Sequence, residues 1–172
     1  VASGRSDEPL QRMSVEKGDV IFVPPGAMHA LGPGIVVAEI QQNSDTTYRV
    51  YDWGRPRPLH LEKALEVADY DLVGARPVVP KVLARSEGLT VELLATCPYF
   101  RTERLTLPAK CEFFGMADGS TFEIFGVLDG RLRLEWDGAP VTLSAVDWVL
   151  VPAELGEFQL VAESNVQILR VF

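Results

Sequence analysis

Residues 18–29 hold the spacing in this sequence that is best suited to binding a metal. A short apolar run leads into Pro24, Pro25 and Gly26, and His29 follows three positions later. The two prolines fix the backbone, and Gly26 allows a turn that a side chain would resist. An imidazole held by such a turn points in a defined direction, as a metal site inside a small β-barrel requires. We therefore predict that His29 binds a metal, the alternative being a satisfied, partly buried histidine.

Arg49 is the second candidate functional residue. Residues 46–51 are rich in side chains of high β propensity, so a strand is predicted to carry it. An arginine at this place could bind an anionic oxygen through two N–H groups or stabilise an enediolate, or it could form a surface salt bridge. Residues 35–40 are predicted to form a buried strand interrupted by Glu39, whose carboxylate would need a hydrogen-bonding partner or lie near the metal or substrate.

Composition narrows the classes of protein. The chain has 172 residues, a formal net charge of −8 and 47% hydrophobic residues, enough for one large or two small domains with a core. No apolar run is long enough to span a membrane, and no basic patch favours nucleic acid as a partner. Residues 1–10 lack the pattern of a signal peptide, and Cys97 and Cys111 form no obvious disulfide framework, which favours a cytoplasmic protein.

The chain is predicted to consist of two parts, residues 1–76 and 77–172. In the first part, residues 18–53 are predicted to form strands, and the apolar spacing of residues 60–68 predicts a short amphipathic helix. His60 begins that helix and is interpreted as a capping or surface histidine in preference to a metal ligand. The helix is expected to lead into an extended linker at residues 69–80.

The second part is predicted to be entirely β. Short apolar or alternating segments recur between turn signals, which is typical of an antiparallel sandwich or jelly roll. The two Asp-Gly dipeptides, at residues 129–130 and 137–138, indicate hairpins. The predicted strands are residues 91–95, 101–107, 122–128, 131–136, 148–151, 158–161 and 166–172.

Two motifs of the first part resemble known families. The spacing G-x5-P-x-G-x2-H at residues 18–29 resembles the second sequence motif of the cupin family, with Pro33 in place of a frequent asparagine. The polar run QQNSDTTYRVYDWGR at residues 41–55 is similar to type I mannose-6-phosphate isomerase in its short bacterial form. The resemblance is strong over roughly the first 70 residues and extends to the rest only in architecture.

The resemblance implies a mainly β fold of cupin-type antiparallel jelly rolls with a short linking helix. Residues 1–76 would be the C-terminal part of a catalytic cupin, and residues 77–172 a degenerate, metal-free cupin. Within the second part, DWVLVP echoes DVIFVP of the first part, and this alignment places Glu157 where His29 lies. Glu123 opens the E-x6-G spacing of a first cupin motif, but no His-x-His precedes it.

The resemblance also implies an activity, the interconversion of mannose 6-phosphate and fructose 6-phosphate by zinc-assisted proton transfer through an enediolate. His29 would be a ligand of Zn²⁺, and Arg49 would face the phosphorylated hexose. A catalytic zinc takes three protein ligands and an open position. The other ligands would come from an earlier motif, so we expect this chain to be the C-terminal portion of a longer enzyme and nearly inactive alone. The base, the phosphate ligands and the oligomeric state, including a homodimer, stay open.

Other classes remain as alternatives. One is a non-catalytic sugar-binding cupin, which would need neither His29 nor Arg49. Another is an oligomerisation module that pairs through its sheet edges. A third is a different metal-dependent cupin such as a dioxygenase, although that chemistry usually needs several His and carboxylate ligands.

Overall fold

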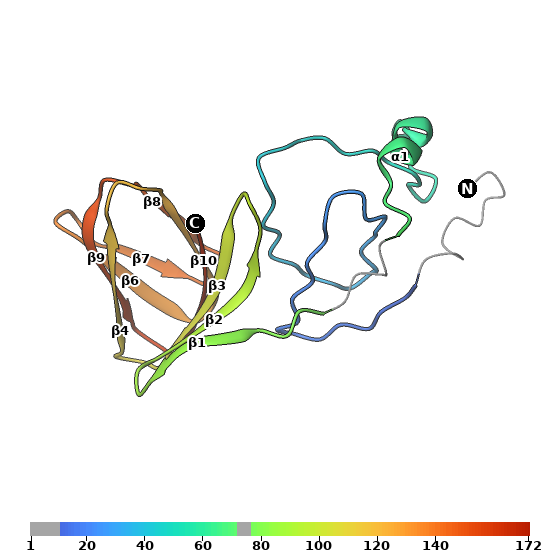
Figure 1. The fold of residues 1–172 in the computed structure, drawn as a ribbon. Helices are drawn as coiled ribbons and strands as arrows, with labels where there is room; N and C mark the ends of the chain where they lie inside the picture. The colour runs from blue at the N-terminus through green and yellow to red at the C-terminus, as the bar shows by residue number, and fades with distance from the viewer. Residues whose placement is uncertain (1–10, 72–76) are drawn as a thin grey trace. The chain divides into compact units, whose positions relative to one another are not determined.

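The computed structural model describes residues 11–71 and 77–172, which belong to two compact units, Val1–Val78 and Val79–Phe172 (Figure 1). The predicted linker lies partly outside the described residues. The assignment of the two parts as a catalytic and a degenerate cupin stays a prediction. Within the described residues, no helix is both long enough and apolar enough to cross a membrane.

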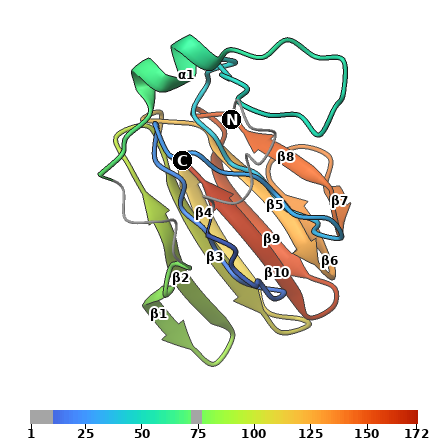
Figure 2. The same cartoon turned by 90° about the vertical axis from the view of Figure 1, so that its right-hand side faces the viewer.

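The second unit consists of two antiparallel sheets (Figures 1 and 2). The six-stranded sheet has the order β1 (Lys81–Ser86), β2 (Leu89–Thr96), β3 (Arg101–Leu107), β10 (Val166–Val171), β5 (Glu123–Asp129) and β8 (Trp148–Val151). The four-stranded sheet has the order β4 (Glu112–Ala117), β9 (Gly156–Ala162), β6 (Arg131–Glu135) and β7 (Val141–Ser144). The strand axes of the two sheets are roughly aligned in Figure 2. The prediction of a mainly β fold with the antiparallel sheets of a jelly roll is therefore confirmed for this unit.

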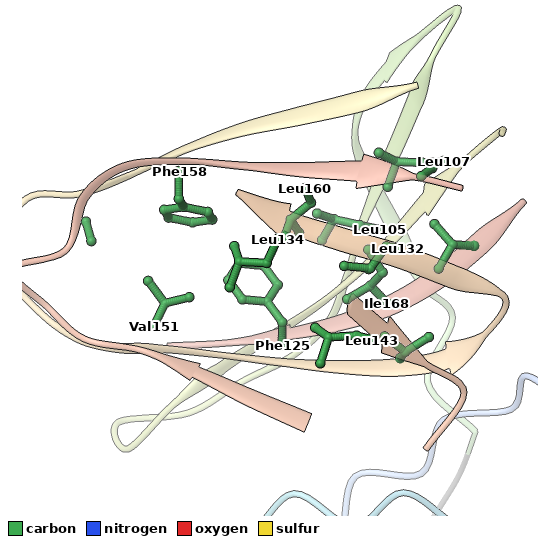
Figure 3. Close-up of a cluster of buried hydrophobic side chains, with 14 residues drawn as sticks. Leu105, Leu107, Phe125, Leu132, Leu134, Leu143, Val151, Phe158, Leu160 and Ile168 are labelled. Atoms are coloured by element: carbon green, nitrogen blue, oxygen red, sulfur yellow. The ribbon is translucent and has the colours of Figure 1, made fainter. Parts of the chain in front are cut away.

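The core lies between these two sheets and follows from the alternation of apolar residues along each strand. Leu132 and Leu134 of β6 are buried while their neighbours are more exposed, as a strand with one buried face requires. In Figure 3 the labelled side chains of both sheets point toward one another. The rings of Phe125 and Phe158 meet edge to face with their centroids 5.7 Å apart. Burial of each large apolar side chain stabilises the unit by about 1.5–3 kcal/mol.

Seven of the ten strands of this unit coincide with predicted strands, and β1, β4 and β7 were not predicted. Strand β4 contains Gly115, and a Cβ there would lie 2.1 Å from the ring of Phe158, so the core requires a residue of low β propensity. The hairpin predicted at residues 137–138 is confirmed, because β6 pairs with β7. The hairpin predicted at residues 129–130 is wrong. There Gly130, with φ of +86°, carries the chain from β5 in one sheet to β6 in the other.

The first unit contains the predicted helix but not the predicted strands. Helix α1 (Leu61–Val67) begins after His60, and among its residues only Ala64 is buried. Among the described residues of this unit, the β pairing is a single bridge between Ile21 and Pro77, so the prediction of strands over residues 18–53 is wrong. A strand is stable only in a ladder with neighbours, and high β propensity cannot replace the missing partner.

The predicted buried strand at residues 35–40 is also wrong. Val36 is 99% exposed, and Glu39 is exposed, so its carboxylate needs no buried partner. The segment has the apolar composition of a buried strand. However, no backbone among the described residues pairs with it.

Candidate functional site

The turn before His29 is rigid for reasons that the structure makes explicit. The Ala27 N–H donates to the carbonyl O of Pro24 at 3.2 Å, which closes the turn. Gly26 has φ of +83°, and a Cβ there would lie 2.9 Å from the carbonyl O of Val67. The Asp69 N–H donates to the Gly26 carbonyl O at 3.0 Å. The turn is therefore held against the end of α1, and only glycine fits without strain.

His29 is exposed, and the position of its ring is fixed by one contact. Its Nδ1 lies 2.9 Å from the carbonyl O of Ala27. A carbonyl can only accept, so a hydrogen bond here requires the proton on Nδ1, and in the neutral ring the lone pair of Nε2 is then free. Metal-binding histidines commonly donate the other ring N–H to a backbone carbonyl in this way. The donor chemistry of His29 thus fits a metal ligand.

Further ligands are needed to complete such a site. Across residues 11–71 and 77–172, no group of three or more His, Cys, Asp or Glu side chains could hold a metal ion. Neither a hydrogen bond nor an ion pair joins His29 to Arg49 in the described part of the chain. Each of the two predicted site residues is held by its own neighbours.

Arg49 is half-buried and is held at both its backbone and its side chain. Its N–H donates to His60 Nδ1 at 3.2 Å, and the His60 N–H donates back to the Arg49 carbonyl O at 2.8 Å. The guanidinium Nη1 donates to the carbonyl O of Pro58 at 3.3 Å. His60 occupies the N-cap position of α1, but its side chain makes no capping hydrogen bond. The predicted capping position of His60 is therefore confirmed, but its backbone carbonyl caps α1 while its ring Nδ1 accepts from the Arg49 N–H.

The loop after Arg49 is fixed by a buried carboxylate. Asp52 is 4% exposed, and both its oxygens accept hydrogen bonds from the guanidinium of Arg57. These hydrogen bonds hold the pKa of Asp52 below its usual value. Trp53 and Gly54 both have positive φ, and the Arg55 N–H donates to the Asp52 carbonyl O at 3.0 Å, as in a type I′ turn. The sequence analysis did not predict this ion pair between Asp52 and Arg57, although both residues lie in one short run.

A similar turn occurs in both units, at Asp19 in the first and at Asp147 in the second. Asp19 and Asp147 each accept a hydrogen bond, at 2.8 Å, from the backbone N–H three residues earlier. The residue before each aspartate has a positive φ, 98° for Gly18 and 77° for Val146. The echo between the two segments in the sequence is thus also an echo in backbone geometry.

The second recurring turn lies at the end of the same segments. The Leu155 N–H donates to the Pro152 carbonyl O at 3.1 Å, as the Ala27 N–H does to Pro24 at 3.2 Å. Glu157, which the alignment places opposite His29, is exposed on β9. The correspondence therefore extends through the turn that aims His29.

The second unit also holds a cluster of buried charges. Glu123 accepts hydrogen bonds from Arg170 Nε at 2.6 Å and Nη2 at 2.7 Å, and Arg170 Nη1 reaches Glu103 at 3.5 Å. Each of the three residues lies two positions from a core residue of its own strand, so all three belong to the inward face. Burial tends to lower the pKa of Arg170, but the two carboxylates more than offset this and raise it. Glu123 is thus neutralised by an arginine.

Comparisons with known proteins identify sequences similar to this chain. No protein-family model matches the chain. The chain is 34% identical over 166 residues to mannose-6-phosphate isomerase ManA of Bacillus subtilis, covering 93% of this chain and 51% of that protein. It is 30% identical to the mannose-6-phosphate isomerase of Streptococcus mutans, over 92% of this chain and 50% of that protein. This chain is homologous to the mannose-6-phosphate isomerases.

A solved structure of such an isomerase is also similar to this chain. The crystal structure of the mannose 6-phosphate isomerase from Bacillus subtilis matches with a TM-score of 0.62 at 27% identity. The match covers 76% of this chain and 41% of that one. The chain spans about half the length of the curated mannose-6-phosphate isomerases that it matches. The homology covers 93% of this chain, and so includes the segments that carry His29 and Arg49.

Proposed function

We propose that the protein containing this chain interconverts mannose 6-phosphate and fructose 6-phosphate. The observation that carries the proposal is the identity with curated mannose-6-phosphate isomerases over more than nine-tenths of the chain. An aldose–ketose isomerase moves a proton between C1 and C2 of the sugar, and negative charge develops on the oxygens of the enediolate. The protein must therefore supply positive charge and hydrogen-bond donors at these oxygens.

His29 is proposed as one ligand of a zinc ion. Its Nε2 is free to bind a cation, because the Nδ1 proton is directed to the Ala27 carbonyl O at 2.9 Å. When bound, zinc would act as a Lewis acid toward the sugar oxygens. The described residues supply this one ligand within a recognisable motif, so the remaining ligands are expected outside them.

Arg49 is proposed as the catalytic residue of this chain. One guanidinium N–H group is used on the Pro58 carbonyl O, and Arg49 makes no salt bridge within the described residues. Its other N–H groups can therefore donate to a sugar oxygen on which negative charge develops. Asp52, the nearby carboxylate, is hydrogen-bonded to Arg57, and the charge of Arg49 helps to lower its pKa without an ion pair between the two among the described residues.

The proposal is tested in the complete gene product that contains these residues. Turnover of mannose 6-phosphate is followed by coupling fructose 6-phosphate to a dehydrogenase, and zinc content is measured by mass spectrometry. His29→Ala is expected to lose both zinc and activity. Arg49→Ala is expected to keep zinc and to lose about 10²–10³-fold in kcat, as when a donor to a developing oxyanion is removed. Arg49→Lys should recover little, because the planar fork is lost.

Two matched variants control for surface effects. Met28→Ala changes the exposed neighbour of His29, and Arg85→Ala removes an exposed arginine of β1. Both should keep zinc and turnover. Zinc retained in His29→Ala would refute its role as a ligand. A wild-type protein that binds zinc but does not turn over mannose 6-phosphate would overturn the proposed activity and favour a sugar-binding cupin.

A further inference from the structure

The backbone of Arg49 is hydrogen-bonded to His60. We propose that His60 is a positioning residue for Arg49, holding it where its guanidinium meets the substrate. The effect on turnover rests on the proposed function, whereas the contact itself does not. His60 acts through Arg49 and is not a catalytic residue.

The contact consists of two hydrogen bonds that join the same two residues in opposite directions. The Arg49 N–H donates to His60 Nδ1 at 3.2 Å, and the His60 N–H donates to the Arg49 carbonyl O at 2.8 Å. A backbone N–H can only donate, so Nδ1 of His60 must be the unprotonated ring nitrogen. His29 requires the opposite arrangement, because its Nδ1 faces a carbonyl. The two histidines are therefore held in different protonation patterns by their backbone partners.

Both the backbone and the ring of His60 make further contacts. The His60 carbonyl O accepts from the Ala64 N–H at 2.9 Å, the first hydrogen bond of α1. The ring also lies 6.2 Å from the ring of Tyr48, centroid to centroid, and Lys63 Nζ lies 5.9 Å from the Tyr48 ring centroid. His60 thus ties the segment before and at Arg49 to the first turn of α1.

Loss of this tie should displace Arg49 without altering its charge. A displacement of about 1 Å in a group that acts on the transition state can lower turnover by about 10²-fold. Binding of the sugar phosphate depends on many other contacts. We therefore expect kcat to fall by about 10–100-fold, with KM changing by less than about threefold.

Three substitutions separate the acceptor from the bulk of the ring. His60→Asn places a carbonyl oxygen the same number of bonds from Cα as Nδ1, so it can accept from the Arg49 N–H. His60→Gln places its oxygen one bond further away, and His60→Leu has no acceptor. We expect His60→Asn to keep most of the turnover, while His60→Gln and His60→Leu lose it. Glu66→Gln, an exposed change on α1, is the control and should behave as wild type.

Hydrogen exchange of the Arg49 amide gives a readout independent of activity. Exchange should accelerate in His60→Leu and His60→Gln and stay slow in His60→Asn. If His60→Asn and His60→Leu are impaired alike, or if the Arg49 amide exchanges equally in all variants, the positioning role is refuted. If the wild-type protein shows no isomerase activity but the exchange pattern holds, the proposed function fails while the contact stands.

Discussion

Replacement of Arg170 by methionine should destabilise the second unit more than the loss of an exposed arginine does. The Arg170 side chain is 22% exposed, whereas those of Glu103 and Glu123 are 4% and 7% exposed. Arg170→Met leaves the volume nearly unchanged but removes the cation. Glu103 retains Arg101, whose Nη2 lies 2.6 Å from its Oε1. Glu123 loses its partner in both of its hydrogen bonds with Arg170.

The magnitude follows from that difference between the two carboxylates. Removal of one partner from a buried ion pair costs about 3–5 kcal/mol, because an uncompensated charge stays buried. One carboxylate keeps a cation, so the lower part of this range applies. The guanidinium also lies 4.6 Å from the centroid of the Phe172 ring, a contact worth about 0.5–1 kcal/mol, which the methionine side chain partly replaces. We expect Arg170→Met to lower the free energy of unfolding by about 3–4 kcal/mol.

Urea denaturation at neutral pH measures this free energy. Arg131→Met is the matched control, because Arg131 is 59% exposed and its partner Glu163 keeps Arg133. The control should cost at most about 1 kcal/mol. Adding Glu123→Gln to Arg170→Met should recover part of the loss, since it removes the orphaned charge.

Two results would refute this reasoning. One is a loss in Arg170→Met no larger than in the exposed control. The other is a double variant that is no more stable than Arg170→Met. A loss of this size is a large fraction of a typical stability of about 5–15 kcal/mol. If Arg170→Met does not fold, Arg170→Lys serves instead, because it keeps the charge and loses only the bidentate geometry.

Two further predictions concern the fold. Gly115→Ala should lower the free energy of unfolding by about 1–3 kcal/mol in urea denaturation, because its Cβ would lie 2.1 Å from the buried Phe158 ring. Gly126→Ala, whose Cβ meets the half-exposed Trp148 ring, should cost less, since that ring can move outward; an equal cost would argue against this account. Because the pKa of Asp52 is lower in the folded protein, its contribution is fully present above the ordinary value of about 3.9 and is lost as pH falls toward the folded value. Replacing it with asparagine should flatten this acid loss in urea midpoints measured from neutral pH downward, and an unchanged pH profile would contradict the assignment.

The strands of the second unit could largely be predicted from sequence, and the exceptions have physical causes. Alternation along β6 placed Leu132 and Leu134 in the core, as observed. Strand β4 was not predicted because it contains Gly115, which has low β propensity. The core requires glycine there for its small size. The Asp-Gly at residues 129–130 has the same local signal as a true hairpin, but only long-range pairing decides that β5 and β6 lie in different sheets.

The candidate site was predictable only in part. His29 and Arg49 lie in runs of fixed spacing, which could be recognised in one sequence. The partner of Arg49 could not be found in the same way, because His60 lies 11 positions later and its hydrogen bond depends on how the chain turns between them. The buried ion pair of Asp52 was not predicted either, although its partner lies close in the sequence. Its partner Arg57 is only five positions away, but an exposed salt bridge has the same sequence signal as a buried one.

A comparison of the two units shows that turns are encoded by local sequence, whereas strands are not. Turns at Asp19 and Asp147 share the same hydrogen bond at 2.8 Å and the same left-handed residue before the aspartate. The apolar run after Asp147 becomes β8 and pairs with β5, whereas the run after Asp19 forms a single bridge, at Ile21, within the described part of the chain. A turn is satisfied by its own few residues, but a strand needs another backbone beside it. The turn that aims His29 can therefore form without a completed sheet.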